Sequence, residues 1–250
     1  MKKLLFLIFP LIGFSSAWGE ISIQNDQQFL GDDGILHIVG EIQNNFNAPI
    51  NQIEIHASLY SGEILVDTIQ THPMLNTIMP NMKSPFDIII FRDTAKKIDE
   101  YFLDVNYEIT EPKSQVIDIT KSDFIQDSSN NLMISGTVVN KGVTTANTIV
   151  VVATLYDKYG NVAAVSKTHV EPDYLRANDE SFFFVSIPDK TQTNSIVDYS
   201  LAAESEEYTA VPEFPLGSML LLTISVSVYV LLTRYSSKVI ANLVSAVNLK

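Results

Sequence analysis

Apolar and polar side chains alternate along most of the chain between residues 20 and 210. A period of two is typical of β-strands that turn one face toward a core and the other away from it. Helical spacing does not occur before the last forty residues. The pattern predicts six or seven short strands in the first half and the same set downstream. Those of the first half lie near Ile21–Ile23, Leu36–Asn44, Gln52–Tyr60, Ile64–His72, Phe86–Phe91 and Tyr101–Ile109.

The chain contains an internal repeat. When the sequence is shifted by 96 positions, residues 20–60 match residues 116–156 without a gap and with eleven identities in forty-one positions. The offset grows to 97 and then to 98 at places where loops can absorb an insertion. The identical pairs include Gly40 with Gly136, Asn44 with Asn140, Tyr60 with Tyr156, and Phe86 with Phe183. Units of this length fit whole domains rather than solenoid repeats.

The repeat predicts an all-β fold with two tandem β-sandwich domains of immunoglobulin-like type, since many short alternating strands are separated by polar turns. We expect the first repeat to span residues 20–110, a linker to span 111–115 and the second repeat to span 116–205. Each repeat is expected to fold alone. With no cysteine in the chain, core burial rather than disulfides must stabilise them.

The segments Ile134–Gly142 and Val152–Gly160 resemble the small immunoglobulin-like domains named for a Phe-x-Leu-Tyr-Asp strand, and also adhesion-related domains of bacteria. Val152 stands at the Phe of that name. The first repeat keeps Leu59 and Tyr60 but has Ser61 in place of the aspartate. The resemblance covers about 90 residues in each repeat. It implies structural roles for the shared residues and no catalytic residue.

The N-terminal residues have the pattern of a signal peptide. Lys2 and Lys3 precede the apolar stretch Leu4–Phe14, and small residues up to Gly19 come next. A charged start, an apolar centre and a small-residue end predict a signal peptide over residues 1–19 and export of the segment from Glu20 onward.

The C-terminal residues have the pattern of a membrane anchor. Residues 214–233 are uncharged and long enough for one transmembrane helix. They come after a predicted stalk, residues 206–213, and precede a basic, amphipathic tail, residues 234–250, that contains Arg234 and Lys238. Because basic residues stay on the cytoplasmic side, we expect a single-pass protein of the cell membrane with an extracellular ectodomain.

Pro212, Glu213 and Phe214, together with an apolar span and Arg234, resemble the C-terminal sorting signals of archaeal surface proteins. The resemblance implies a sortase-like processing enzyme as a partner, which cuts near the tripeptide and moves the protein to another anchor.

The displayed segment is strongly acidic. Between Glu20 and Glu213 it holds 29 Asp and Glu and 11 Lys and Arg, so its net charge is 11 − 29 = −18. This charge argues against binding to nucleic acid, whose phosphates require basic partners.

The sequence contains no catalytic motif and predicts no cofactor. It has no cysteine nucleophile, Gly-rich phosphate loop, His-Glu-x-x-His or calcium loop. His37 and His56 lie on outward positions and could hold a metal only weakly, so surface histidines are the better interpretation. The acidic pairs Asp32-Asp33 and Asp123/Asp127 are better explained as turn residues than as cation ligands.

The outward positions of the two repeats differ in chemistry. Those that are apolar in the second repeat are Met133, Val139, Val150, Val152, Phe182 and Phe184. Their counterparts in the first repeat are His37, Gln43, Glu54, His56, Pro85 and Asp87. An exposed apolar patch on a soluble domain usually marks a contact surface. Three explanations stay open: a partner protein, a contact between the repeats, or a wrong assignment of inward and outward positions.

The sequence therefore favours a non-enzymatic, membrane-anchored surface protein with a structural or protein-interaction role. The alternative is an extracellular accessory module that binds a metal or small ligand for a neighbouring membrane complex. An enzyme is the least favoured of the three.

The signal peptide generates a prediction about the mature protein. Cleavage should occur after Ala17 or Gly19, because these small residues end the apolar stretch. N-terminal peptide mapping of the surface protein should find a mature start at Trp18 or Glu20. Recovery of Met1 or Lys2 in the surface form would contradict the prediction.

Overall fold

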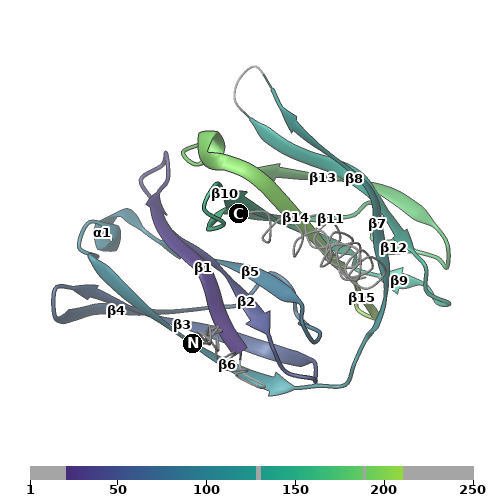
Figure 1. The fold of residues 1–250 in the computed structure, drawn as a ribbon, viewed down its shortest axis with the longest axis horizontal. Helices are drawn as coiled ribbons and strands as arrows, with labels where there is room; N and C mark the ends of the chain where they lie inside the picture. The colour runs from purple at the N-terminus through teal and green to yellow at the C-terminus, as the bar shows by residue number, and fades with distance from the viewer. Residues whose placement is uncertain (1–20, 128–130, 188–189, 211–250) are drawn as a thin grey trace, which may run out of the picture. The chain divides into compact units, whose positions relative to one another are not determined.

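The computed structural model describes residues 21–127, 131–187 and 190–210, and this part of the chain is all-β with several sheets (Figure 1). It lies within one compact unit that ends at Val211. Within it, no helix is long and apolar enough to cross a membrane.

Four predicted features lie outside the described residues. They are the signal peptide (1–19), the sorting residues Pro212, Glu213, Phe214 and Arg234, the transmembrane helix (214–233) and the tail (234–250).

The first repeat forms two three-stranded antiparallel sheets, with the orders β1-β2-β5 and β4-β3-β6. A single turn of helix, α1 (Arg92–Ala95), precedes β6. All six predicted strands are present, and β1, β3, β5 and β6 are longer than predicted. The strands are β1 (Ile21–Leu30), β2 (Leu36–Asn44), β3 (Ile50–Ser61), β4 (Ile64–Thr71), β5 (Lys83–Ile90) and β6 (Glu100–Ile109).

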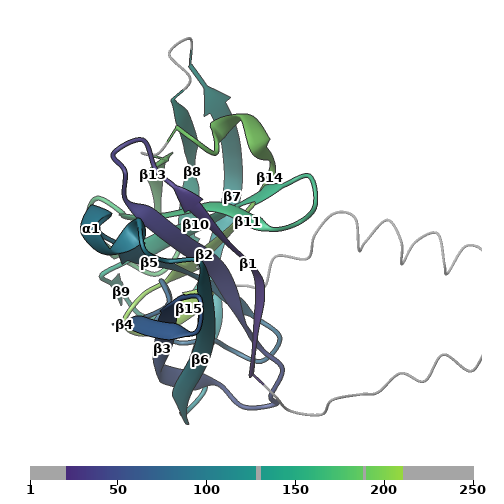
Figure 2. The same cartoon turned by 90° about the vertical axis from the view of Figure 1, so that its left-hand side faces the viewer.

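The second repeat contains the same two sets of strands. β7-β8-β13 corresponds to β1-β2-β5, and β11-β10-β14 corresponds to β4-β3-β6 (Figure 2). The main strands are β7 (Ser114–Gln126), β8 (Leu132–Asn140), β10 (Val150–Asp157), β11 (Val162–His169), β13 (Glu180–Ile187) and β14 (Ile196–Glu204). The short elements are β9 (Ala146–Asn147), β12 (Tyr174–Leu175), the 3-10 turn η1 (Thr193–Ser195) and β15 (Tyr208–Ala210).

The second repeat extends further than the sequence predicted. β15 falls in the predicted stalk, yet it pairs with β14 and, in parallel, with β7, so it joins the two strand sets into one sheet. Tyr208 is buried in the core, and its hydroxyl lies 3.0 Å from the Thr144 amide nitrogen. β7 in turn begins at Ser114, inside the predicted linker 111–115. The stalk and linker boundaries are corrected accordingly.

Each repeat has its own hydrophobic core between its two strand sets. Ile38, Leu59 and Phe86 belong to the first core. Their counterparts Ile134, Leu155 and Phe183 belong to the second. Neither cluster contains a residue from the other repeat.

Two buried asparagines show that the repeats share local structure as well as topology. The Asn44 side chain donates to the carbonyls of Ala48 (3.0 Å) and Ile78 (2.8 Å). Asn140, its counterpart, donates to the carbonyls of Thr144 and Leu175, both at 2.8 Å. In each case the amide satisfies backbone groups of two separate loops, which a buried loop requires.

A glycine in the second strand of each repeat makes room for a core phenylalanine. A Cβ built on Gly136 would lie 2.5 Å from the Phe183 ring and would also collide with the Lys121 carbonyl oxygen. A Cβ on Gly40 would lie 2.6 Å from the Phe86 ring. The conflict at Gly136 involves backbone, which cannot rotate away.

This close packing predicts the effect of adding one methyl group. Gly136→Ala should lower the free energy of unfolding by about 1–3 kcal/mol, since overpacking forces the backbone of β7 to move. Thr137→Ala, at the next position and on the outer face, should cost less than about 1 kcal/mol. Urea denaturation of a fragment spanning residues 20–210 measures both. Equal, small changes would contradict the packing described for Gly136.

Candidate functional site

The two repeats meet through the outer faces of two strand sets, meaning the faces turned away from each core. β11 of the second repeat contacts β1, β2 and β5 of the first. Among the described residues, six buried apolar side chains belong to neither core. They lie on β2, β10 and β11 and in the loop after β4. They are Val39, Leu75, Val150, Val152, Val162 and Ala163.

Glu41 on β2 is buried in this contact, with only 1% of its surface exposed. Its carboxylate accepts hydrogen bonds from Lys83 Nζ (2.8 Å), from Asn25 Nδ2 (3.1 Å) and from the Tyr156 hydroxyl. Burial, together with the Glu41 charge, raises the pKa of Tyr156, so the phenol stays protonated and remains a donor. Tyr156 belongs to the second repeat, so this bond ties the two repeats together.

Glu204 on β14 makes the reciprocal connection, from the second repeat to the first. One carboxylate oxygen accepts from the Asn76 backbone amide (2.6 Å) and from Asn76 Nδ2 (2.9 Å). The other accepts from the Thr77 amide at 3.3 Å. Burial raises the pKa of Glu204, an effect that these amides and the charges of Lys113 and Lys167 partly offset.

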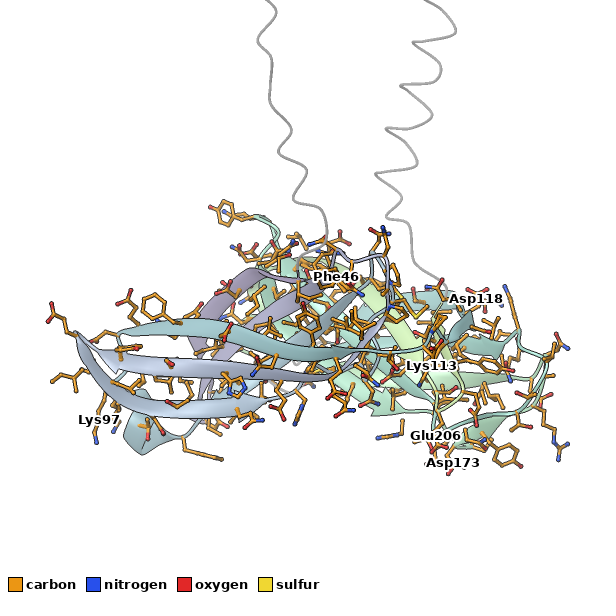
Figure 3. The ribbon with its side chains drawn as sticks, turned by 90° about the horizontal axis from the view of Figure 1, so that it is seen from below. Phe46, Lys97, Lys113, Asp118, Asp173 and Glu206 are labelled. Atoms are coloured by element: carbon orange, nitrogen blue, oxygen red, sulfur yellow. The ribbon has the colours of Figure 1, made fainter. Side chains whose placement is uncertain are left out.

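A cavity of about 370 Å³ lies beside Glu204. Both repeats contribute to its lining, the first through Met74 and Asn76 and the second through Val150 and His169, among others. Lys113 and Glu206, which Figure 3 labels, also line it. Lys113 Nζ is engaged with the Ser205 carbonyl at 3.0 Å.

Two of the six predicted surface residues lie inside this contact. Val150 and Val152 are 8% and 1% exposed, and they share the outer face of β10 with Tyr156. The prediction of an exposed surface is therefore corrected at these two positions. Alternation showed that they point away from their own core, but it did not show that the first repeat covers them.

Phe182 and Phe184 lie on the outer face of β13 and are 53% and 50% exposed. Their rings form an edge-to-face pair with centroids 4.8 Å apart. Phe183, between them, points inward and fills the core with 2% exposure. The inward and outward positions of this strand are therefore unambiguous.

Met133 and Val139 lie on the same face and are partly buried. In the register of β8 and β13, Met133 is opposite Ser186 and Val139 is opposite Glu180. We call this surface the aromatic face and define it by Met133, Val139, Phe182 and Phe184. It is the outer face of β7-β8-β13.

The histidines considered as metal ligands are not brought together. His37 Nδ1 lies 3.0 Å from both carboxylate oxygens of Asp87, in the sheet β1-β2-β5. His56 lies in the other sheet, where its Nε2 is 3.1 Å from Asn106 Nδ2. Across the described ranges, no group of three or more His, Asp or Glu side chains is placed to hold a metal ion.

Asp32, Asp33 and Asp127 lie in the connections after β1 and β7, whereas Asp123, which was predicted as a turn residue, lies on β7 opposite Ser135. Asp33 accepts the Ile35 amide at 2.9 Å, and Asp127 accepts the Asn131 amide at 2.9 Å. These bonds close the β1–β2 and β7–β8 connections.

Sequence reasoning missed Glu41 and Glu204. A glutamate at an outward strand position usually faces solvent, so neither residue gave a signal by itself. One signal was available: Val150 and Val152 are apolar although they point outward, and Glu204 lies on the same face of the sheet. A covered apolar face would also bury Glu204.

A comparison with known protein families and with curated proteins finds no match for this chain. Among solved structures it is similar to the transglutaminase of red sea bream, with 12% identity, a TM-score of 0.23, and coverage of 79% of this chain and 32% of that one. It is also similar to the exo-chitosanase CsxA of Amycolatopsis orientalis, with 10% identity, a TM-score of 0.27, and coverage of 77% and 26%. The chain thus spans a third or less of either protein, and likenesses at this level carry no argument about its activity.

The Glu204 contact generates a prediction about stability. Glu204→Ala should cost about 1–3 kcal/mol, because the Asn76 and Thr77 amides lose their acceptor. Because burial raises the pKa of Glu204 above its ordinary 4.5, its stabilising contribution is fully present below pH 4.5 and is lost as the pH rises through the raised value. The difference between the parent and the variant should therefore be larger at pH 4.5 than at neutral pH.

Thermal melts of the 20–210 fragment at the two pH values test this. Glu63→Ala, an exposed glutamate in the β3–β4 turn, is the matched control and should melt like the parent. A Glu204→Ala variant that also melts like the parent would show that the contact contributes nothing.

Proposed function

We propose that this chain is a membrane-anchored cell-surface protein that displays two immunoglobulin-like β-sandwich repeats outside the cell. Its role is structural or in protein interaction, without enzymatic activity. The signal-peptide pattern, the uncharged span 214–233 and the basic flank after it support the address. The resemblance around Pro212, Glu213 and Phe214 supports processing by a sortase-like enzyme.

The observation that carries the interaction role is the exposed pair Phe182 and Phe184. Nothing in the fold requires aromatic residues there, because Phe183 already fills the core and the first repeat has Pro85 and Asp87 at the equivalent positions. Aromatic side chains commonly act as anchors of protein interfaces, where a few residues supply most of the binding energy.

A second candidate is an accessory module for a metal or small ligand, and the cavity beside Glu204 is the observation that favours it. Its lining combines Lys113, Lys167 and His169 with Glu204 and Glu206. This charge balance suits a small polar ligand better than a metal ion. Native mass spectrometry of the purified protein would detect a co-purifying ligand.

The interaction role predicts a separation of folding from binding. Phe184→Asp should leave the melting temperature of the 20–210 fragment nearly unchanged, since half of the side chain is already in solvent. On intact cells, the same substitution should remove the neighbours that a lysine crosslinker captures with the parent protein.

Val197→Asp is the matched control, since Val197 is an apolar residue on β14 with 65% exposure. It introduces the same charge away from the aromatic face and should leave the captured neighbours unchanged. A large drop in melting temperature for Phe184→Asp, or unchanged neighbours, would rule out the aromatic face as the contact surface.

A further inference from the structure

The aromatic face is the counterpart of a surface that is covered in the first repeat. It is the outer face of β7-β8-β13, and β1-β2-β5 is the equivalent set in the first repeat. The outer face of β1-β2-β5 is occupied by β11 and its neighbours from the second repeat. The same fold thus has a docking face that is filled in one repeat and open in the other.

The covering surface has a counterpart that is also open. β11-β10-β14 covers the first repeat, and β4-β3-β6 is the equivalent set. Its outer face carries Glu54 and His56 at the positions of Val150 and Val152, together with Tyr60, Leu65 and Phe102. We call the surface formed by Tyr60, Leu65 and Phe102 the receiving face. Phe102 and Leu65 are 59% and 53% exposed, and the rings of Tyr60 and Phe102 lie edge to face at 5.6 Å.

We propose that the aromatic face of one molecule binds the receiving face of another molecule of the same chain. The contact would repeat between molecules the arrangement that joins the two repeats within one molecule. This inference rests on the proposed interaction role of the aromatic face and identifies the partner.

The internal contact supplies a register for the external one. Within the molecule, Gln27 Nε2 donates to the Val162 carbonyl at 2.7 Å. The counterpart of Gln27 is Asp123. Gln27 pairs with Val39 on β2, Asp123 pairs with Ser135 on β8, and Val39 and Ser135 are equivalent positions of the two repeats. The counterpart of Val162 is Leu65. Val162 pairs with Tyr156 directly after a register shift between β10 and β11, and Leu65 pairs with Tyr60 after the same shift between β3 and β4. Asp123 of one molecule should therefore lie beside Leu65 of the next.

The same register brings aromatic residues of the two faces together. In the internal contact Tyr156 donates to Glu41. The counterpart of Tyr156 is Tyr60, and the counterpart of Glu41 is Thr137. Thr137 is directly opposite Phe182 in the ladder between β8 and β13. Tyr60 of the next molecule would thus meet Phe182, so two surfaces with exposed rings cover each other.

One pair of charges also agrees with this register. Lys121 is the counterpart of Asn25, which donates to Glu41 in the first repeat. Lys121 and its two neighbours on β7 are exposed. Glu100 is opposite Tyr60 in the β3–β6 ladder and is exposed. The contact would place opposite charges near each other at its rim, which favours the correct orientation.

The two faces are different, so the contact is head-to-tail rather than symmetric. Each molecule offers one aromatic face and one receiving face. A heterologous contact of this kind builds rows or rings instead of closed dimers.

The absence of cysteine from the chain allows a direct test by disulfide trapping. Two full-length variants, Asp123→Cys and Leu65→Cys, are given different tags, reconstituted together in phosphatidylcholine vesicles and mildly oxidised. Both positions are exposed, so neither change should disturb folding. We expect mixed, disulfide-linked dimers to exceed like-with-like dimers. Adding Phe184→Asp to the Asp123→Cys variant should abolish the mixed dimer, whereas adding Val197→Asp should not.

Three outcomes would overturn the inference. Predominant dimers of Asp123→Cys with itself would mean that two aromatic faces pair symmetrically. Mixed dimers that persist with Phe184→Asp would mean that trapping does not depend on the aromatic face. Absence of any dimer, while Phe184→Asp still removes captured neighbours on cells, would mean that the partner is a different protein. In that last case the proposed interaction role stands, and it fails only if the cell experiment fails as well.

Discussion

The contact between the outer face of β1-β2-β5 and the strands β10 and β11 is the constraint on which the rest of the structure depends. It buries two carboxylates, Glu41 and Glu204, each of which would be costly to remove from water without partners. Both are satisfied across the contact, Glu41 by Tyr156 and Glu204 by the amides of Asn76 and Thr77. Lys83 and Asn25 of the first repeat also donate to Glu41, but Tyr156, Asn76 and Thr77 each donate to an acid of the other repeat, so these bonds fix the repeats in one register as well as holding them together.

This constraint decides which surfaces remain for function. Each repeat has two outer faces, and one from each repeat is used in the internal contact. The remaining two are the aromatic face of the second repeat and the receiving face of the first. Both faces carry exposed aromatic rings, Phe182 and Phe184 on one and Phe102 on the other, and these interrupt the polar exterior that the acidic composition predicts. A duplicated domain has thus kept its core and changed its outer faces, which is how one fold can take on new partners.

Much of the fold could be predicted from the alternation of side chains and from the internal repeat. The range Leu36–Asn44 was predicted as a strand and is β2, and the paired Asn44 and Asn140 end equivalent strands and make equivalent hydrogen bonds. The shift by 96 correctly paired Gly40 with Gly136, each of which faces a core phenylalanine. These features are local, or depend on a single sheet, so the sequence alone carries them.

The predictions that failed depended on contacts between distant parts of the chain. Val150 and Val152 point outward as predicted but are covered by another repeat, and periodicity holds no information about what covers a face. Tyr208 was assigned to a stalk because three residues make too short a pattern to recognise as a strand. Glu204 gave no signal, since only the position of Asn76, 128 residues away, makes it a buried acceptor.

Amide hydrogen exchange at Asn76 tests the central claim most directly. Asn76 is an exposed residue in the loop between β4 and β5, and its amide donates to Glu204 at 2.6 Å across the contact between the repeats. If the contact is formed in solution, this amide should exchange much more slowly than an unprotected loop amide, and Glu204→Ala should abolish its protection. Exchange at the rate of an open loop in the parent protein would show that the repeats are not joined through Glu204, and would contradict the account.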